Sequence, residues 1–167
     1  MKFKLIVIGH GRHGKDTVCE ILSKYYEYKF TSSSRFCGEN VVFPILSKKY
    51  NYKTIDECYD DRHNHRKEWF DLIAEYNKND PSNLGRLLFD EYDIYCGLRR
   101  KEELIALKDH NIADYTIWVD ASDRLPPESP DSCTVTKEMA DYIIYNNGTL
   151  EELEKSVHEL MKLLKPT

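Results

Sequence analysis

The sequence predicts an α/β protein in which a central parallel sheet of five strands lies between two layers of helices. Two observations carry this prediction. Short apolar segments alternate along the chain with segments of helical periodicity, and parallel strands need such crossover helices. The first apolar segment, residues 3–9, runs into a glycine-rich loop and then into an amphipathic helical pattern. Strand, glycine-rich loop and helix in this order open a doubly wound α/β domain.

The remaining elements follow from the same periodicities. Further strands are expected at 93–96, 114–121 and 140–145. Helices are expected directly after the glycine-rich loop, over 62–77, around 104–107 and from 150 onwards. Thr149 and Glu152 form a capping box for the last helix. The stretch 31–34 is a loop or a strand end, and Pro44 is expected to interrupt whatever element it falls in.

Length and composition restrict the class of protein. The 167 residues are sized for a single domain, 1–167, and 41% of them are hydrophobic, enough for a sizeable core. A net charge of −5 argues against general binding to nucleic acids or anionic membranes. No apolar run is long enough to cross a bilayer, and the N-terminal one is too short for a secretory signal. Five cysteines without a C-x-x-C pair argue against disulfides or zinc, so we expect a cytoplasmic protein.

The glycine-rich loop carries the clearest functional motif. Residues 9–15 fit the pattern G-x-x-x-x-G-K, in which glycines let backbone N–H groups wrap around phosphate oxygens and the lysine reaches the β- and γ-phosphates. The position after Lys15 is normally Ser or Thr, but here it is Asp16 followed by Thr17. The residues expected to hold the nucleotide phosphates are Gly9, Gly11, Arg12, His13, Gly14, Lys15, Asp16 and Thr17.

In the Gly-Lys-Asp-Thr element, the chain resembles P-loop (deoxy)nucleoside monophosphate kinases, in particular the phage-type deoxynucleoside monophosphate kinases; phosphomevalonate kinase shares Gly-Lys-Asp. Residues 140–153 are similar to the C-terminal strand, loop and helix of these kinases and of dephospho-CoA kinases. The resemblance implies that Asn146, Asn147 and Gly148 lie beside the base of ATP. Residues 96–104 resemble, more loosely, the end of a central strand in this class. Residues 36–60 and 125–137 match nothing. If the gene is phage-encoded, the compartment is the host cytoplasm.

The expected magnesium site departs from the pattern of these kinases. They often hold a carboxylate at the end of a central strand, and here Cys96 or Gly97 takes that place. We hypothesise that Asp16, with Thr17, supplies the oxygen ligands for Mg²⁺ that the strand end lacks. The alternative is that Asp93 or Asp120 serves instead and that Asp16 only tunes the loop.

Arginines outside the loop are candidates for contacts with the transferring and acceptor phosphates, because phosphoryl transfer requires mainly positioning and positive charge. Arg99 follows the central strand and is the principal candidate. Arg124 opens the lid-like segment 122–137, and it is expected to close over the donor phosphates. The segment 31–84 is expected to bind the acceptor, through Arg35, Arg62, Arg66, Phe36 and Trp69. For the aromatic rings and the 62/66 pair, core packing and ordinary surface charge are alternatives.

The sequence therefore predicts a kinase that transfers the γ-phosphate of MgATP to a small-molecule acceptor, a ribo- or deoxynucleoside monophosphate. The expected catalytic residues are Lys15, Asp16, Arg99 and Arg124, and the cofactors are ATP and Mg²⁺. A different small acceptor (dephospho-CoA, phosphomevalonate or a modified base) is the first alternative. A nucleotide-binding switch without kinase activity is the second. A homodimer is left open.

Overall fold

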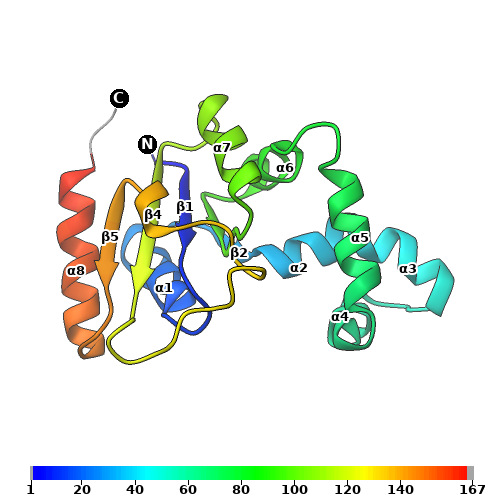
Figure 1. The fold of residues 1–167 in the computed structure, drawn as a ribbon, viewed down its shortest axis with the longest axis horizontal. Helices are drawn as coiled ribbons and strands as arrows, with labels where there is room; N and C mark the ends of the chain where they lie inside the picture. The colour runs from blue at the N-terminus through cyan, green and yellow to red at the C-terminus, as the bar shows by residue number, and fades with distance from the viewer. Residues whose placement is uncertain (1, 165–167) are drawn as a thin grey trace.

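The structure is a computed structural model that describes residues 2–164, and it confirms the predicted architecture. Five parallel strands form one sheet in the order β2-β3-β1-β4-β5. They are β1 (Leu5–Ile8), β2 (Phe30–Ser32), β3 (Ile94–Cys96), β4 (Tyr115–Asp120) and β5 (Tyr142–Tyr145). Because β1 pairs with both β3 and β4, the loops that follow these strands meet at one edge of the sheet (Figure 1).

Helices cover both faces of this sheet and extend beyond its β2 edge (Figure 1). They are α1 (Lys15–Tyr26), α2 (Ser33–Cys37), α3 (Phe43–Tyr50), α4 (Ile55–Asp60), α5 (Arg66–Tyr76), α6 (Asn83–Glu91), α7 (Lys101–Asp109) and α8 (Leu150–Leu163). Among residues 2–164, no helix combines the length and the apolar character needed to cross a membrane.

The central strand is apolar throughout because both of its faces are covered. Leu5 and Val7 pack with the apolar faces of α1 and α8, whereas Ile6 and Ile8 pack on the opposite side with residues of α6 and α7. All four side chains are fully buried. This two-sided burial is the physical reason for the uninterrupted apolar segment in the sequence.

The region between β2 and β3 differs in detail from what its sequence predicts. Pro44 does not interrupt a helix: α2, a π-helical turn over Gly38–Val42 and α3 form one continuous run, with the proline in the first turn of α3. Widened turns of this kind accommodate a residue that has no N–H to donate. The predicted helix 62–77 is divided into a 3₁₀ turn (Arg62–Asn64) and α5. Helix α6 is an addition to the predicted elements.

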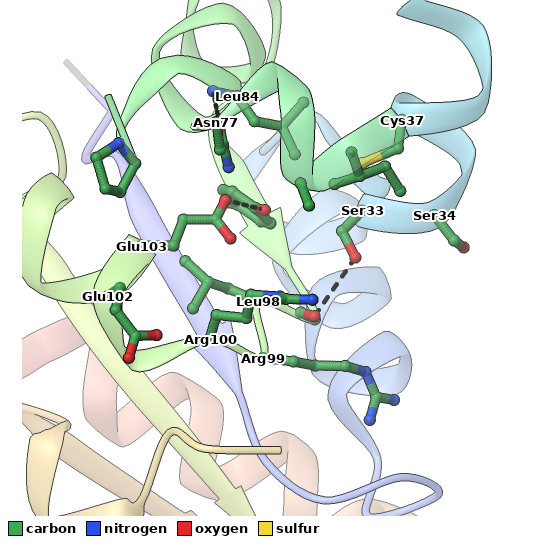
Figure 2. A pocket seen from close by; sticks show the side chains of 15 residues that line it. Ser33, Ser34, Cys37, Asn77, Leu84, Leu98, Arg99, Arg100, Glu102 and Glu103 are labelled. Atoms are coloured by element: carbon green, nitrogen blue, oxygen red, sulfur yellow. Dashed lines mark hydrogen bonds between the residues drawn. The ribbon is translucent and has the colours of Figure 1, made fainter. Parts of the chain in front are cut away.

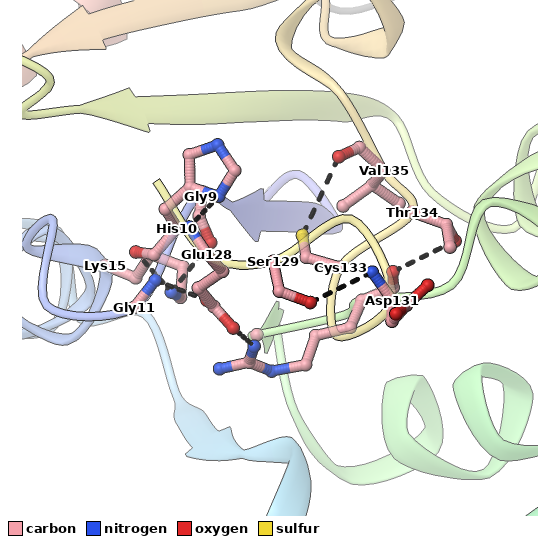
Figure 3. Close-up of polar contacts among 12 residues, drawn as sticks. Gly9, His10, Gly11, Lys15, Glu128, Ser129, Asp131, Cys133, Thr134 and Val135 are labelled. Carbon is pink, nitrogen blue, oxygen red and sulfur yellow. Dashed lines mark hydrogen bonds and ion pairs between the residues drawn. The ribbon is translucent and has the colours of Figure 1, made fainter. Parts of the chain in front are cut away.

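The C-terminal elements agree with the prediction. Thr149 caps α8, its side-chain oxygen accepting a hydrogen bond from the Glu152 N–H at 3.2 Å. The segment 122–137 is long and largely irregular, ending with the start of a 3₁₀ turn (Lys137–Met139), and it passes across the edge of the sheet at which the glycine-rich loop lies (Figures 1 and 3).

Candidate active site

The glycine-rich loop connects β1 to α1, and two of its glycines are required by close contacts. Gly9 has a φ of 151°, and a Cβ atom there would lie 2.5 Å from the Val119 carbonyl oxygen. Gly14 has a φ of 106°, and a Cβ atom there would lie 2.4 Å from Nδ2 of Asn146. Both positions combine a left-handed backbone with no room for a side chain. The loop is therefore held against the ends of β4 and β5.

Lys15, the first residue of α1, folds back over the loop. Its Nζ donates hydrogen bonds to the carbonyl oxygens of Gly9, at 2.8 Å, and His10, at 3.0 Å. Burial lowers the pKa of Lys15, and the neighbouring Arg99 guanidinium lowers it further. The ammonium group is thus a cation that lacks an anionic partner inside the loop.

The two histidines of the loop bind the 122–137 segment rather than solvent. His13 is 1% exposed; its Nδ1 accepts from the Ala121 N–H at 2.9 Å, so its Nε2 carries the proton and donates to the Pro126 carbonyl oxygen at 3.1 Å. His10 Nδ1 accepts from the Glu128 N–H at 3.1 Å. Burial and the adjacent His13 lower the pKa of His10, which favours its neutral, accepting form.

Glu128 places a carboxylate against the phosphate loop (Figure 3). One carboxylate oxygen accepts a hydrogen bond from the Gly11 N–H, and the other forms an ion pair with Arg99. Burial works to raise the pKa of Glu128, but Arg99, the Gly11 N–H and Lys15 together hold it below its usual value. The loop N–H and Arg99 thus each bind one oxygen of an anionic group, and a phosphate would present oxygens of the same kind. No sequence motif marks this residue.

Asp16 faces the end of β3. The Cys96 thiol donates a hydrogen bond to Asp16 Oδ1 at 3.5 Å, so the carboxylate lies beside the end of β3. Asp93 instead lies at the opposite end of β3, where it accepts from the Lys29 N–H at 2.8 Å. Asp120, at the end of β4, accepts from the Ser122 N–H at 2.8 Å.

The oxygen donors at the start of α1 fit a magnesium ion that is also bound by phosphate and water. Asp16 is exposed and Thr17 is half-buried, both directly after Lys15, and Mg²⁺ in nucleotide sites typically has one or two protein ligands. Within residues 2–164, no cluster of three or more His, Cys, Asp or Glu side chains is arranged to hold a metal. A site here would depend on the oxygen atoms of the bound nucleotide.

The Asn146–Gly148 loop, which the resemblance places beside the donor base, is tied to the phosphate loop. Asn146 Nδ2 donates to the His13 carbonyl oxygen at 3.0 Å. Arg124 donates to the Asn146 carbonyl oxygen from Nε at 3.0 Å and from Nη2 at 2.7 Å. The Arg124 guanidinium therefore lies on this loop. A shallow cavity of about 380 Å³ is lined by residues 145–149 and the first turns of α8.

A larger cavity, of about 420 Å³, opens beyond the ends of β2 and β3 (Figure 2). In Figure 2, Glu103 and Leu98 lie on one side of it and Ser33 and Cys37 on the other. Arg99 lines this cavity and also the small cavity that the phosphate loop forms with residues 125–128. Arg99 is therefore a residue that the two spaces share.

Glu103, in the first turn of α7, is the buried carboxyl group of this cavity. The Tyr95 hydroxyl donates to Glu103 Oε1 at 2.5 Å. Burial raises the pKa of Glu103 to about 7, against the opposing effects of the Tyr95 hydrogen bond and of Arg100. Glu103 does not stand out in the sequence, because a Glu in the first turn of a helix usually has only a capping or solvated role.

The residues predicted to bind the acceptor divide into two groups. Arg99 lines the cavity, whereas Arg35 forms ion pairs with Glu39 and Asp56. Arg62 stacks on the ring of Tyr59, 3.9 Å from its centroid, and Arg66 is exposed. The rings of Phe36 and Trp69 are 1% and 7% exposed and belong to the core. Apart from Arg99, none of the predicted acceptor residues lines the cavity: Arg35, Arg62, Arg66, Phe36 and Trp69 all lie outside its lining.

Comparison with known proteins gives fold neighbours only. No protein-family model matches the chain, and no curated protein matches it. Among solved structures, similar ones include TT1252 from Thermus thermophilus (TM-score 0.51, 16% identity, covering 99% of each chain). A second similar structure is shikimate kinase from Bacteroides thetaiotaomicron, with a TM-score of 0.50 and 14% identity over 95% of this chain and 96% of that chain. A third is dephospho-CoA kinase from Campylobacter jejuni, with a TM-score of 0.50 and 16% identity over 97% of this chain and 96% of that chain. The chain therefore shares the overall α/β fold of the shikimate kinase and of the dephospho-CoA kinase.

Proposed function

We propose that this chain is an ATP-dependent phosphotransferase that transfers the γ-phosphoryl group of MgATP to a ribo- or deoxynucleoside monophosphate. The observation that carries the proposal is the position of Arg99, which lines both the space in front of the phosphate loop and the 420 Å³ cavity beside it. A donor in the first space and an acceptor in the second would meet at this guanidinium. The likeness to solved small-molecule kinases supports the same class of reaction.

The donor phosphates would occupy the place that the Glu128 carboxylate now holds. The Gly11 N–H already donates to an anionic oxygen there, and Lys15 would exchange its two loop carbonyls for phosphate oxygens. The N-terminus of α1 adds its partial positive charge to the same position. Glu128 has to leave when the donor binds, so the 122–137 segment would act as a lid.

Mg²⁺, when bound, would neutralise charge on the β- and γ-phosphates. Asp16 and Thr17 would hold it, directly or through water. The position of Asp16 beside Cys96 at the end of β3 supports the hypothesis that it replaces the missing strand-end carboxylate. Asn146, Asn147 and Gly148 would hold the base, with Arg124 fixing their loop.

In the transfer itself, an oxygen of the acceptor phosphate attacks the γ-phosphorus while the bond between that phosphorus and the oxygen of ADP breaks. Lys15 and Arg99 neutralise the charge that spreads over the transferring oxygens. No general base is needed, since the acceptor phosphate is already an anion. Arg99 also orients that acceptor from the wall of its cavity.

A second acceptor is favoured by one observation. The dephospho-CoA kinase from Campylobacter jejuni has the same fold over 97% of this chain, so dephospho-CoA belongs in any test of acceptors, as does phosphomevalonate on the basis of the Gly-Lys-Asp element.

The test is a coupled assay of ADP release from MgATP, run with a panel of ribo- and deoxynucleoside monophosphates, dephospho-CoA and phosphomevalonate. We expect turnover that depends on one or a few nucleoside monophosphates and that falls at least about a thousandfold in Lys15→Ala. Turnover with dephospho-CoA or phosphomevalonate alone would reassign the acceptor. Binding of ATP without acceptor-dependent turnover would contradict the proposal and favour a nucleotide-binding switch.

A further inference from the structure

Glu103 is a buried carboxyl group that phosphoryl transfer, as proposed above, does not use. It is 7% exposed and forms part of the wall of the acceptor cavity. A carboxyl group withdrawn from water is unfavourable unless hydrogen-bond donors satisfy it. Its place in a cavity wall therefore points to donors on the molecule that fills the cavity.

The two oxygens of Glu103 have different surroundings. Oε1 accepts the hydrogen bond from the Tyr95 hydroxyl, whereas Oε2 has no hydrogen-bond partner among the residues that the structure describes. Among residues 2–164, every buried side-chain oxygen or nitrogen has a hydrogen-bond partner. Because Oε2 has no such partner, it is not a buried atom, and it reaches the open space of the cavity. Figure 2 shows this second oxygen turned away from the dashed hydrogen bond.

The rest of the cavity wall is largely apolar. The apolar side chains come from α2, α5, α6, the segment before α6 and the segment after β3, and they are Cys37, Ile73, Ala74, Pro81, Leu84 and Leu98. Ser33, Ser34, Asn77 and Glu102 add polar groups at separate points of the lining. A polyol acceptor would leave several hydroxyl groups without partners against such a wall. A flat heterocycle, with two apolar faces and a polar edge, suits it better. The volume of about 420 Å³ is within the range of small-molecule sites.

Positive charge marks the end of the cavity nearest the phosphate loop, where Arg99 lines both spaces. Arg100 also lines the cavity, stacks on the exposed ring of Phe70 at 4.4 Å and lies close enough to Glu103 for its charge to lower the pKa of that carboxyl group. Since Arg99 also faces the phosphate loop, the phosphate of an acceptor belongs at this end and its heterocycle belongs towards Glu103. Burial raises the pKa of Glu103 to about 7, and donors on a bound molecule would favour the ionised, accepting form of the carboxyl group.

We propose that Glu103 reads the base of the acceptor: its carboxylate accepts hydrogen bonds from ring and amino N–H groups, which favours guanine because guanine presents two such donors side by side. Tyr95 is the positioning residue that fixes the orientation of the carboxylate. The inference rests on the proposed function, since it names the base class of the acceptor in the same site. It adds a specificity determinant to a reaction for which Lys15 and Arg99 carry the phosphate chemistry.

The test compares kcat/KM for dGMP, dAMP, dCMP and dTMP in the wild-type protein and in Glu103→Gln. A hydrogen bond to a charged group discriminates by about ten- to a hundredfold. We expect the wild-type protein to prefer dGMP by that factor, through KM, and Glu103→Gln to reduce the preference to about threefold or less. The matched control is Asp109→Asn, which removes a carboxylate from the exposed C-terminal end of α7, outside the cavity lining, and is expected to leave the ranking of bases unchanged.

A second variant guards against misfolding of the first. Tyr95→Phe keeps the Glu103 carboxylate but removes its hydrogen bond, and we expect KM for dGMP to rise about five- to tenfold with kcat little changed. Retention of the wild-type base ranking in Glu103→Gln, or a wild-type preference for another base, overturns the inference while nucleoside monophosphate kinase activity stands. Absence of turnover with every nucleoside monophosphate overturns the proposed function itself. Calorimetric titration with dGMP in the absence of ATP distinguishes these outcomes from a defect in phosphoryl transfer alone.

Discussion

The donor and acceptor sides of the candidate site are built in different ways. The donor side is one continuous loop, residues 9–15, whose N–H groups and glycines are positioned by the backbone between β1 and α1. The acceptor side is assembled from separate segments around α2, α5, β3 and α7, and its wall is largely apolar. A site formed by backbone groups of one loop can be specified by a short sequence motif. A site formed by side chains from separate segments depends on how those segments pack together. Arg99 is the residue that the two sides share.

The sharpest test of this comparison is removal of the shared residue. Arg99→Ala is expected to lower kcat about a thousandfold, because the guanidinium acts on the transferring group rather than on one substrate alone. Arg100→Ala, one residue away but lining only the acceptor cavity, is expected to raise the acceptor KM with kcat changed less than about threefold. Steady-state kinetics with both substrates varied measures this. If Arg99→Ala changed only the acceptor KM, Arg99 would act on the acceptor alone and would not be shared by the two sides.

The acceptor side should show a pH signature in stability that is specific to one carboxyl group. Burial raises the pKa of Glu103 from 4.5 to about 7, so the folded state holds this proton more tightly than the unfolded state. The resulting stabilisation is fully present below about pH 4.5 and is lost as pH rises through 7. Relative to Glu103→Gln, the wild-type protein should lose up to about 3 kcal/mol of unfolding free energy between pH 4.5 and 8.

Urea denaturation of both proteins at several pH values measures this difference. Glu102→Gln, which changes an exposed neighbour, should follow the wild-type curve. Parallel pH profiles for the wild type and Glu103→Gln would show that Glu103 ionises as an ordinary surface carboxyl group.

The donor side should be sensitive to backbone changes instead. Gly14→Ala places a side chain at a φ of 106° and 2.4 Å from Asn146 Nδ2, a strain of about 1–3 kcal/mol. We expect KM for ATP to rise about tenfold and the acceptor KM to stay within twofold of its wild-type value. The acceptor KM serves as the internal control. Equal increases in both values would mean that the two sides do not respond separately.

The smallest expected effect concerns the contact of Glu128 with the phosphate loop and Arg99. Glu128→Gln removes the negative charge that occupies the Gly11 N–H and Arg99, so ATP should bind about three- to fivefold more tightly. Equilibrium titration with a non-hydrolysable ATP analogue measures the dissociation constant. Asp131→Asn, an exposed position on the same segment, is the control. Weaker binding in Glu128→Gln would assign the carboxylate a supporting role in the bound state.

The same contrast explains what the sequence could predict. The sheet, α1 and α8 follow from strong periodicities, and the phosphate loop is contiguous, so its residues lie together as expected. Phe36 and Trp69 are aromatic residues of the kind that can stack on a ligand, but they lie in the core. Their burial depends on packing between helices, which local sequence does not reveal. Glu103 and Glu128 act through partners 8 and 117 residues away in sequence. Neither residue type nor local spacing distinguishes them from other glutamates.

The sharing of Arg99 couples the affinities of the two substrates. The guanidinium holds Glu128 in place while the loop is empty, and an acceptor phosphate would compete for the same group. Each substrate should then reduce the dissociation constant of the other by the same factor, as thermodynamic linkage requires. If the proposed function holds, binding of the acceptor would help to release Glu128 from the donor loop, and hydrolysis of ATP by water would be limited until the acceptor is bound.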